Sequence, residues 1–410
     1  MRLLFVVQRY GHEVAGGAEL HCRQFATILA ERGHDVDALT SCATSYVDWA
    51  DFYEPGTSEL DGVTVHRLPV RSPRDDRLFG PLNGRVVWGR KPVPLYLQED
   101  WMRKQGPYLP DLGPWLAERS ASYDVVIFFT YLYYTTWMGL HVTAGCVPTV
   151  LHPTAHDEPS MALTMFDTMF RLPTTLAFSV EEEAALVHER FGRGVASGII
   201  GIGTDLDAAG DPDTFRQSFG LDDRPYLVFI GRVDPGKGSQ ELYEFFVQYK
   251  ARNPGPLALV IVGEAVTKMP DHPDIVMTGF VSDDVRDSAL AGALALVQPS
   301  YFESFSMILS EAWAHRKPAL VQGHCDVLEG QCRRSGGGIP YRGFAEFEAA
   351  VDLLGEDAAL RARLGEAGRR YVERHSTWAA VLDRYERLVT MARRAEPSRY
   401  FRPRTPAAAR

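Results

Sequence analysis

The chain has 410 residues, and at about 150 residues per domain this length predicts two or three domains, of which two is the simpler expectation. Apolar residues make up 45% of the chain and charged residues 23%, so the composition is that of a globular protein with a packed core. The formal net charge of −10 argues against nonspecific binding to nucleic acid, which depends on Lys and Arg neutralising phosphates. Any anionic ligand must therefore be held by local cations.

The five cysteines are scattered and include no Cys-x-x-Cys pair or zinc-binding spacing, which favours a reducing, cytoplasmic environment. The apolar run at the N-terminus is too short for a signal peptide, and no stretch approaches the roughly 18 apolar residues of a membrane span. We therefore expect any membrane contact to be peripheral, at the inner membrane face.

The first half of the chain has the pattern of a parallel α/β sheet. Residues 1–7 form a short apolar run suited to a strand that is buried on both faces. Ala18, Cys22, Phe25 and Leu29 then recur at helical spacing, which predicts a helix that ends near Gly33. Because strand-like and helical segments continue to alternate, we expect a parallel sheet. The further strand-like runs are residues 63–68, 124–129 and 148–151.

Residues 71–115 interrupt this alternation with many Pro, Gly and aromatic residues. The segment 71–104 contains eight Arg or Lys against four Asp or Glu. We interpret it as an irregular basic insertion on the first domain. A surplus of positive charge suggests an anionic or lipid-diphosphate acceptor at a membrane surface, although a solvated loop explains it as well.

A second α/β domain follows a turn-rich, acidic segment at residues 203–224, because a strand-like run at 226–230 restarts the strand, Gly loop, helix pattern. Residues 346–389 read as helical, with a break near 375–377. The expected organisation is a first domain at 1–205, a linker at 206–224, a second domain at 225–376, a helix at 377–394 that returns to the first domain, and a disordered tail at 395–410. The further strands of the second domain are expected at 257–262, 275–278, 294–297 and 319–321.

Two glutamates, Glu303 and Glu311, follow an apolar strand, and ligands of open α/β sheets bind at the carboxyl ends of strands. Ser304 or Ser306 can cap the helix that carries Glu311, leaving N–H groups that attract a phosphate. A glycosidase pair is an alternative, but eight residues along a helix span about 12 Å, against roughly 5 to 9.5 Å between hydrolase carboxylates. A capping loop with a solvated glutamate remains equally open.

Two cations, Arg232 and Lys237, follow the strand at 226–230 in a loop that begins at Gly231. A tight Asp-Pro-Gly turn lets both face one point above the sheet, where they would stabilise a departing diphosphate, although a solvated loop is the alternative. The loop has the spacing of a Walker motif, but Gly238 replaces its hydroxyl residue, which argues against an ATPase.

In the first domain, Gly17 begins a helix, and glycine there permits close backbone approach to a ligand, although an ordinary turn explains it equally well. His156 lies near His152 after a strand. Pro153 disfavours the helix that would let both histidines bind one metal, so we expect no metal site. For His156 we weigh a polar role towards an acceptor against a structural one.

Taken in order, these motifs resemble the retaining GT-B glycosyltransferases of family 4 over nearly the whole chain. The most specific element is a Glu-x7-Glu motif, which runs from Glu303 to Glu311 and is preceded by Pro299-Ser300. It is accompanied by Gly231-Arg232 with Lys237-Gly238, Val262-Gly263-Glu264 and Gly279-Phe280-Val281. The family commonly has glycine where this chain has Ser304 and Ser306.

The resemblance implies two Rossmann-like, doubly wound domains facing across a cleft, and a hexose-type sugar transferred from a nucleoside-diphosphate sugar without a metal or other cofactor. It also implies retention, with a proton passing from the acceptor to a donor phosphate oxygen. The acceptor would be a glycan, a lipid-linked sugar or a small molecule. The implied roles are Arg232 and Lys237 on the diphosphate, Glu311 on the ribose, Glu303 on the transferred sugar, Val281 on the base, Gly17 on the phosphate and His156 beside the reacting sugar and acceptor. Further donor-binding residues would be Gly231, Gly263, Ser304, Phe305, Ser306 and Met307.

Other functions remain open at this point. A GT-B nucleotide-sugar epimerase would share the architecture, and a non-catalytic nucleotide-sugar binding protein would share the donor site. A nicotinamide dehydrogenase is disfavoured because the chain lacks the Gly-x-Gly-x-x-Gly fingerprint after its first strand.

Overall fold

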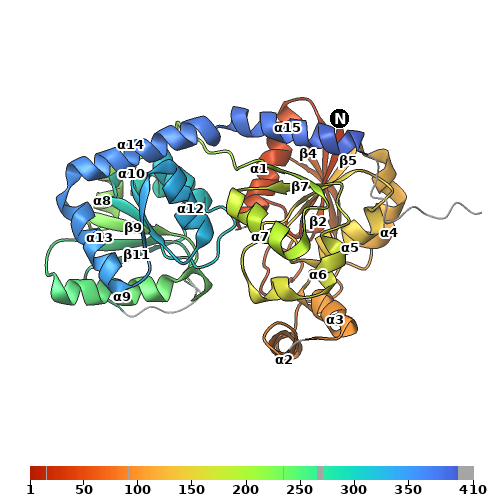
Figure 1. Cartoon of the computed structure of the whole chain (residues 1–410), viewed down its shortest axis with the longest axis horizontal. Coiled ribbons are helices and arrows are strands. Elements are labelled where there is room, and N and C mark those ends of the chain that lie inside the picture. The colour runs from red at the N-terminus through yellow and green to blue at the C-terminus, as the bar shows by residue number, and fades with distance from the viewer. Residues whose placement is uncertain (15, 91, 234, 266–270, 396–410) are drawn as a thin grey trace, which may run out of the picture. The chain divides into compact units, whose positions relative to one another are not determined.

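The computed structural model describes residues 1–14, 16–90, 92–233, 235–265 and 271–395. The chain divides into two compact units (Figure 1). Unit 1 contains Met1–Ile200 together with the described residues after Leu382, and unit 2 is Gly201–Leu382. The tail expected to be disordered lies outside the described residues from position 396 onward.

Unit 1 is built on an eight-stranded sheet in the order β3-β4-β2-β1-β5-β6-β7-β8. All neighbouring strands are parallel except β3 and β4. The strands are β1 (Arg2–Val6), β2 (Asp35–Ser41), β3 (Gly56–Leu60), β4 (Val63–Leu68), β5 (Val125–Phe129), β6 (Thr149–His152), β7 (Thr175–Phe178) and β8 (Ala196–Ile199).

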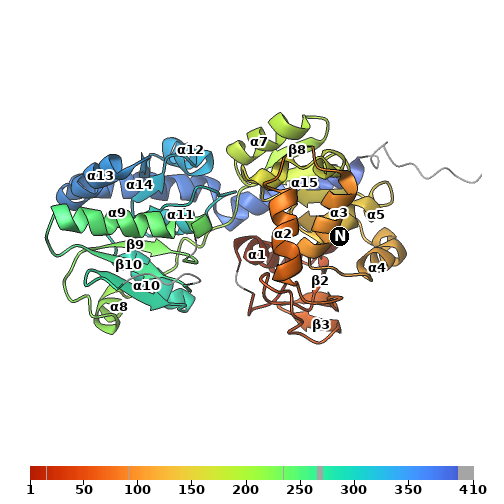
Figure 2. The ribbon, with the colours of Figure 1, turned by 90° about the horizontal axis from the view of Figure 1, so that it is seen from below.

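Helices lie on both faces of this sheet, as a doubly wound fold requires (Figures 1 and 2). On one face α1 (Gly17–Glu31) packs against the last part of α15 (Trp378–Arg394), where the rings of Phe25 and Tyr385 are 4.5 Å apart. The other helices are α2 (Asp76–Val86), α3 (Leu95–Gln105), α4 (Leu112–Arg119), α5 (Tyr134–Thr143), α6 (Met165–Met169) and α7 (Glu181–Phe191), with short 3-10 turns at Ser120–Ser122 and Pro159–Ala162.

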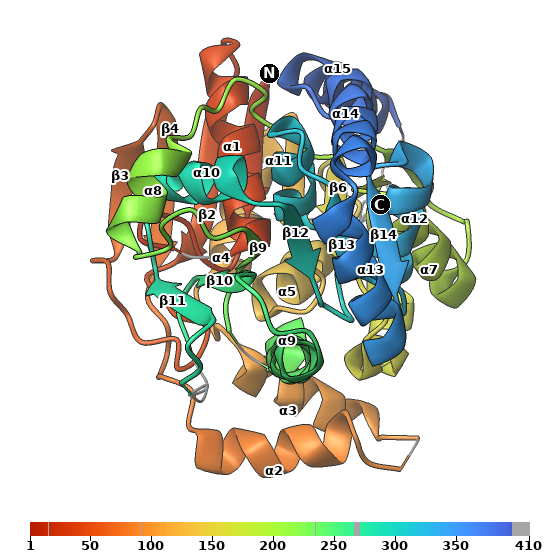
Figure 3. The ribbon, with the colours of Figure 1, turned by 90° about the vertical axis from the view of Figure 1, so that its left-hand side faces the viewer.

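The segment predicted as an irregular insertion is helical, and that prediction was wrong. It forms α2, α3 and α4, because apolar residues such as Phe79, Val86 and Trp101 pack against the core of unit 1. The proline within α2, Pro81, lies at the sixth helical position and does not end the helix. Figures 1 and 3 show α2 outermost, with α3 between it and the rest of the unit.

Unit 2 contains a six-stranded sheet in the order β11-β10-β9-β12-β13-β14, and all its neighbouring strands are parallel (Figure 3). Its strands are β9 (Tyr226–Ile230), β10 (Ala258–Val262), β11 (Ile275–Gly279), β12 (Ala295–Gln298), β13 (Ala319–Gln322) and β14 (Gly338–Tyr341). Its helices are α8 (Pro212–Ser218), α9 (Ser239–Arg252), α10 (Asp283–Gly292), α11 (Met307–Ala314), α12 (Asp326–Ser335), α13 (Phe344–Glu356) and α14 (Ala358–His375).

The expected linker at 206–224 contains α8, which contacts α10 and belongs to unit 2. The helical stretch expected at 346–389 consists of three helices rather than two. Asp357 caps α14 by accepting a hydrogen bond from the Leu360 N–H at 2.8 Å, and this break was not predicted. The break expected at residues 375–377 separates α14 from α15. No helix among the described residues is both long and apolar enough to cross a membrane.

Two histidines lie in the aromatic core of unit 1. His21 of α1 and His152 of β6 are fully buried, with ring centroids 5.5 Å apart, and His152 stacks on Phe129 at 4.2 Å. The Nε2 atom of His152 lies 3.2 Å from the Tyr385 hydroxyl of α15. Burial lowers the pKa of His21 to about 3, and it also lowers the pKa of His152. Both rings are therefore neutral in the folded protein at neutral pH.

Glycines bring three loops of unit 2 into close contact. Gly238 has φ +66°, and a Cβ atom there would lie 2.2 Å from the Pro299 carbonyl oxygen after β12. A Cβ atom on Gly263, after β10, would lie 2.1 Å from the Gly231 carbonyl oxygen after β9. Since non-bonded atoms cannot approach so closely, only glycine permits these backbones to meet in this arrangement.

The two buried histidines predict acid sensitivity. The folded-state pKa of His21 lies below its unfolded value of 6.5, so its contribution to stability is present above pH 6.5 and is lost as the pH falls towards about 3. Between pH 7 and pH 5, His21 alone lowers the free energy of unfolding by about 2 kcal/mol. We expect the free energy of unfolding of His21→Phe to fall by about 2 kcal/mol less than that of wild type between pH 7 and pH 5, as measured by urea unfolding at both pH values. Equal pH dependence of wild type and variant would contradict the prediction.

The close contact of Gly238 predicts that its substitution by alanine destabilises the protein by more than backbone strain alone would. Gly220 is a matched control, since it has φ +63° but open space around its Cβ position. We expect Gly220→Ala to destabilise the protein by about 1 kcal/mol, and Gly238→Ala by a further 1 to 3 kcal/mol, roughly, because a backbone carbonyl must move. Chemical denaturation measures both, and equal losses would show that the loops are not in contact.

Candidate functional site

The candidate donor site in unit 2 is formed by three loops at the carboxyl end of its sheet. They follow β9, β10 and β12, and β9 lies between the other two strands. The Gly231 N–H donates to the Val262 carbonyl at 2.9 Å, and the Val233 N–H donates to the Glu264 carbonyl at 2.9 Å. These bonds fix the loop after β9 against the loop after β10, at the edge where open parallel sheets bind ligands.

The structure brings Lys237 and Glu303 together. Lys237 ends a 3-10 turn at Pro235–Lys237, and its Nζ atom lies 2.7 Å from Glu303 Oε1. The Lys237 side chain is 36% exposed and that of Glu303 is 10% exposed, so the pair is open to solvent on the lysine side. Gln298, at the end of β12, also approaches Glu303 Oε1, at 3.4 Å. A cation and a carboxylate that the sequence analysis assigned to different parts of a donor are therefore neighbours.

The loop from Ser304 to Met307 leads into α11. Ser306 has φ +70° and occupies the N-cap position, but its side chain does not cap the helix, contrary to one of the two caps expected. Its hydroxyl instead accepts a hydrogen bond from Gln298 Nε2 at 3.0 Å. Phe305 is buried, and its carbonyl oxygen accepts from Gln331. The first N–H groups of α11 thus have no side-chain cap and suit an anion.

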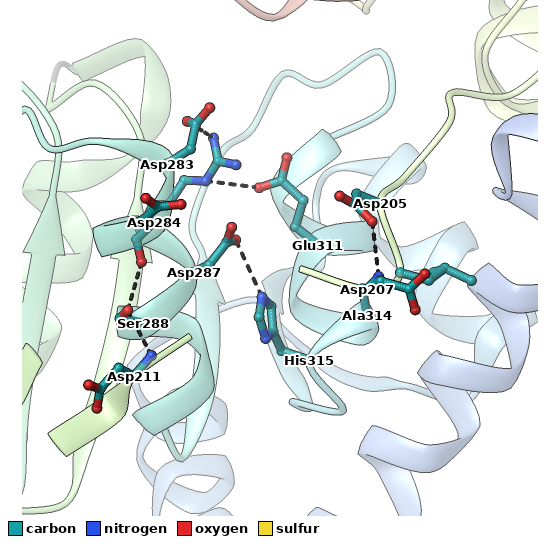
Figure 4. A network of polar contacts seen from close by, with 12 residues as sticks. Asp205, Asp207, Asp211, Asp283, Asp284, Asp287, Ser288, Glu311, Ala314 and His315 are labelled. Carbon is teal, nitrogen blue, oxygen red and sulfur yellow. Dashed lines mark hydrogen bonds and ion pairs between the residues drawn. The ribbon is translucent and has the colours of Figure 1, made fainter. Parts of the chain in front are cut away.

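Glu311 lies on α11 and has a different partner from Glu303 (Figure 4). Its Oε2 atom is 3.4 Å from Arg286 Nε on α10, and its side chain is 20% exposed. Burial raises the pKa of Glu311, Arg286 opposes this, and the nearby Asp287 and Asp283 add to it. The Glu-x7-Glu motif therefore places its two carboxylates in separate ion pairs, each with a different cation.

Three further residues that were singled out by sequence lie at the same edge of the sheet. Arg232 follows β9 after Gly231, and it is exposed. Gly263 follows β10, where its N–H donates to the Gly279 carbonyl at 2.9 Å. Val281 follows β11 and is half-buried. That Arg232 acts with Lys237 on one ligand stays a prediction.

In unit 1, the predicted residues follow two strands that flank β5. Gly17 is the first residue of α1, after β1, and a Cβ atom there would meet nothing within 4 Å. His156 follows β6, is 31% exposed, and has its Nδ1 atom 3.9 Å from Glu158 Oε1. The Glu158 carboxylate also accepts a hydrogen bond from the Tyr131 hydroxyl at 2.6 Å.

Sequence reasoning missed several residues that support these positions. Glu183 of α7 is buried and accepts hydrogen bonds from the N–H groups of Ala155, at 2.8 Å, and Ser179, at 2.6 Å, which holds the loop that carries His156. Burial raises the pKa of Glu183 to about 8. Arg286 and Gln298 were also missed. An acidic residue in the first turn of a helix was the one available signal for Glu183, and nothing in the spacing marks Arg286 or Gln298.

Within the described part of the chain, no group of three or more His, Cys, Asp or Glu side chains is arranged to hold a metal ion. His152, considered above as a partner of His156 for a metal, is buried in the aromatic core and hydrogen bonded to Tyr385.

Comparisons with known proteins agree on family and fold. Residues 211–371 match the family described as Glycosyl transferases group 1. A glycogen synthase of Mycobacterium tuberculosis is 26% identical over 433 aligned positions, covering 99% of this chain and 98% of the relative. Sucrose-phosphate synthase of Thermosynechococcus elongatus has a TM-score of 0.72 at 18% identity, covering 95% of this chain and 98% of that one. Anabaena HepE in complex with UDP-glucose has a TM-score of 0.68 at 16% identity, with 95% and 100% covered.

The family match covers most of unit 2, including Lys237, Glu303 and Glu311, and the glycogen synthase extends the similarity over both units. The two parallel α/β sheets are those of the GT-B fold, shared with the solved structures. The chain is therefore a glycosyltransferase with the GT-B fold, and its residues 211–371 match the glycosyl transferases group 1 family.

Proposed function

We propose that this glycosyltransferase transfers a hexose-type sugar from a nucleoside-diphosphate sugar to a glycan, lipid-linked or small-molecule acceptor, with retention and without a metal. The observation that carries the proposal is the Lys237–Glu303 pair, which lies in the family-matched unit close to the uncapped N-terminus of α11. A structure of HepE with UDP-glucose, which has the same fold, supports the nucleotide-sugar class of donor but not the choice of base or sugar.

Each residue of the donor site has a proposed role. Lys237 and Arg232 stabilise the negative charge of the departing diphosphate, together with the first N–H groups of α11. Glu303 accepts hydrogen bonds from hydroxyls of the transferred sugar, and Glu311 from those of the ribose. Because Lys237 and Glu303 are already 2.7 Å apart, one pair can hold the diphosphate and the sugar on either side of the bond that breaks. Backbone at Gly231, Gly263 and Val281 and the loop of Ser304, Phe305, Ser306 and Met307 would line the donor.

In the proposed reaction, an acceptor hydroxyl oxygen bonds to the anomeric carbon while the bond from that carbon to the diphosphate oxygen breaks. The hydroxyl proton passes to a donor phosphate oxygen, so the products are the glycoside and the nucleoside diphosphate. Attack from the face of the leaving group gives retention without an enzymatic nucleophile. From unit 1, the proposal assigns Gly17 to the donor phosphate and His156 to the reacting sugar and the acceptor.

The proposal predicts a large effect of Lys237→Ala on turnover. One charge pair at about 4 Å is worth roughly 4 kcal/mol at an effective dielectric near 20, and about 1.4 kcal/mol corresponds to a tenfold change in rate. Since Lys237 is partly exposed, we expect turnover to fall by roughly two to three decades. Calorimetric titration with UDP, GDP, ADP and TDP in EDTA should show one nucleotide that binds wild type and loses affinity for the variant.

The matched control is Arg252→Ala, which removes one positive charge from the far end of α9, where Arg252 pairs with Glu348 at 3.2 Å on the surface. It should leave binding and turnover near wild type. Normal kinetics in Lys237→Ala would refute the assignment of the diphosphate site. A product of inverted anomeric configuration, assigned by NMR, would refute the retaining mechanism.

The acceptor side of the proposal includes peripheral contact with an anionic membrane. The exposed face of α2 carries Arg77, Leu78 and Arg85, and the apolar side chains of Trp88 and Tyr96 follow it at 70% and 67% exposure. Arg77, Arg85 and Arg90 form no ion pair with another described residue. Apolar side chains interleaved with cations are suited to the interface of a membrane that contains acidic lipids.

Charge reversal at Arg77, Arg85 and Arg90 to Glu should therefore abolish most binding to phosphatidylglycerol-containing liposomes in a sedimentation assay. Each cation contributes about 1 kcal/mol to attraction by an acidic membrane surface. Reversal of Arg363, Arg370 and Arg374, three exposed arginines of α14, is the control with the same change in net charge. Equal binding by the two triple variants would remove the membrane from the proposal.

A further inference from the structure

Arg286 forms ion pairs with two carboxylates. Its Nη1 atom lies 3.0 Å from Asp283 Oδ1, one turn earlier on α10, and its Nε atom lies 3.4 Å from Glu311 Oε2 on α11. The Arg286 side chain is only 25% exposed, whereas that of Asp283 is 84% exposed. The guanidinium therefore reaches inward from the surface to Glu311, and the second carboxylate restricts its orientation.

A second polar contact joins α10 to the residue that directly follows α11. His315 Nε2 lies 3.3 Å from Asp287 Oδ1, and both side chains are almost buried. His315 is the residue that directly follows α11, one turn after Glu311, and Asp287 is the next residue after Arg286 on α10. Figure 4 shows His315 beside Asp287. The end of α11 that carries Glu311 is thus held against α10 at two points.

Arg286 is the main group that favours the ionised form of Glu311 in acidic surroundings. Figure 4 shows Asp283, Asp284 and Asp287 on α10 and Asp205 and Asp207 in the same region. Burial, Asp287 and Asp283 all raise the pKa of Glu311, and Arg286 is the principal group that lowers it. Without Arg286, Glu311 would be a partly buried carboxyl group among acidic side chains, and its pKa would be raised further.

Arg286 engages one oxygen of Glu311 and leaves the other available. Only Oε2 has a partner among the described residues, so Oε1 retains its capacity to accept a hydrogen bond. A charged acceptor held in one orientation is suited to a neutral hydroxyl group, because hydrogen bonds to an ionised group are stronger than those between neutral groups.

We propose that Arg286 is a positioning residue that orients the Glu311 carboxylate towards the ribose hydroxyls of the donor, and so makes the site selective for ribonucleotides over nucleotides without these hydroxyls. The inference rests on the proposed function, in which Glu311 binds the ribose. Arg286 acts through Glu311 and does not itself contact the reacting atoms.

The test compares affinities for UDP and GDP with those for 2′,3′-dideoxy-UDP and 2′,3′-dideoxy-GDP by calorimetry. Wild type should prefer the ribonucleotide it binds by about 10- to 100-fold, as expected for a charge-assisted hydrogen bond. Arg286→Ala and Arg286→Gln should each lower this preference about tenfold or more, with little change in dideoxynucleotide affinity. Glu311→Gln should do the same, and Arg286→Ala added to Glu311→Gln should cause little further loss. Arg252→Ala should retain the preference.

The outcomes separate this inference from the proposed function. If Arg286 variants weaken ribo- and dideoxynucleotides equally, Arg286 acts through general charge or stability, and the positioning role is wrong. If Glu311→Gln loses the ribose preference while both Arg286 variants keep it, the donor site stands and Arg286 has no role in it. If wild type binds the dideoxynucleotide as tightly as the ribonucleotide, the assignment of Glu311 to the ribose fails and this inference fails with it. If wild type binds neither UDP nor GDP, the same comparison is made with ADP and 2′,3′-dideoxy-ADP.

Discussion

The ion pair between Lys237 and Glu303 depends on backbones that approach each other more closely than any residue other than glycine would permit. Lys237 is followed by Gly238, whose backbone lies against the Pro299 carbonyl, and Glu303 lies four residues beyond that proline. The loop after β9 is held in turn by Gly231 and Gly263 against the loop after β10. A cation from one loop can therefore meet a carboxylate from another at 2.7 Å, although the residues are 66 positions apart in the chain.

The two carboxylates of the proposed donor site each have a cationic partner, and this bears on how the site would bind a charged substrate. Glu303 is paired with Lys237, and Glu311 with Arg286. An unpaired buried charge is costly, so neutralisation by a neighbour lets carboxylates persist in a partly buried site. The same arrangement keeps the cation of Lys237 beside Glu303, the carboxylate proposed to bind the sugar, where the cation is already placed for the diphosphate of the proposed donor.

In unit 1, two of the buried titratable groups are neutral histidines rather than paired charges. His21 and His152 lie in an aromatic cluster with Phe25, Phe129 and Tyr385, where burial keeps both imidazoles neutral. Tyr385 comes from α15, so a residue near the end of the chain completes the core around the first helix and β6. His156, four residues after His152, is partly exposed instead. His152 lies within β6 and belongs to the core, whereas His156 lies in the loop after β6 and is accessible to a ligand.

The sequence by itself determined the alternation of strands and helices, the position of the second α/β domain and the residues that follow its strands. Strands such as β1, β9 and β10 were predictable because they are apolar on both faces and lie inside parallel sheets. The strands β2, β3, β7, β8 and β14 were missed; among them, β2 contains two aspartates and β8 is a partly exposed edge strand. The helices of the basic segment were missed because its Pro and Gly content masked their apolar faces.

Only the tertiary structure decided which charged groups meet. The Glu-x7-Glu spacing places two carboxylates on one segment, but it does not reveal that Lys237 pairs with the first and Arg286 with the second. Sequence periodicity reports which face of an element is buried, because burial of apolar surface repeats along the chain. Ion pairs between loops and between helices carry no such period, since they depend on strand order and helix packing between residues that are distant in the chain.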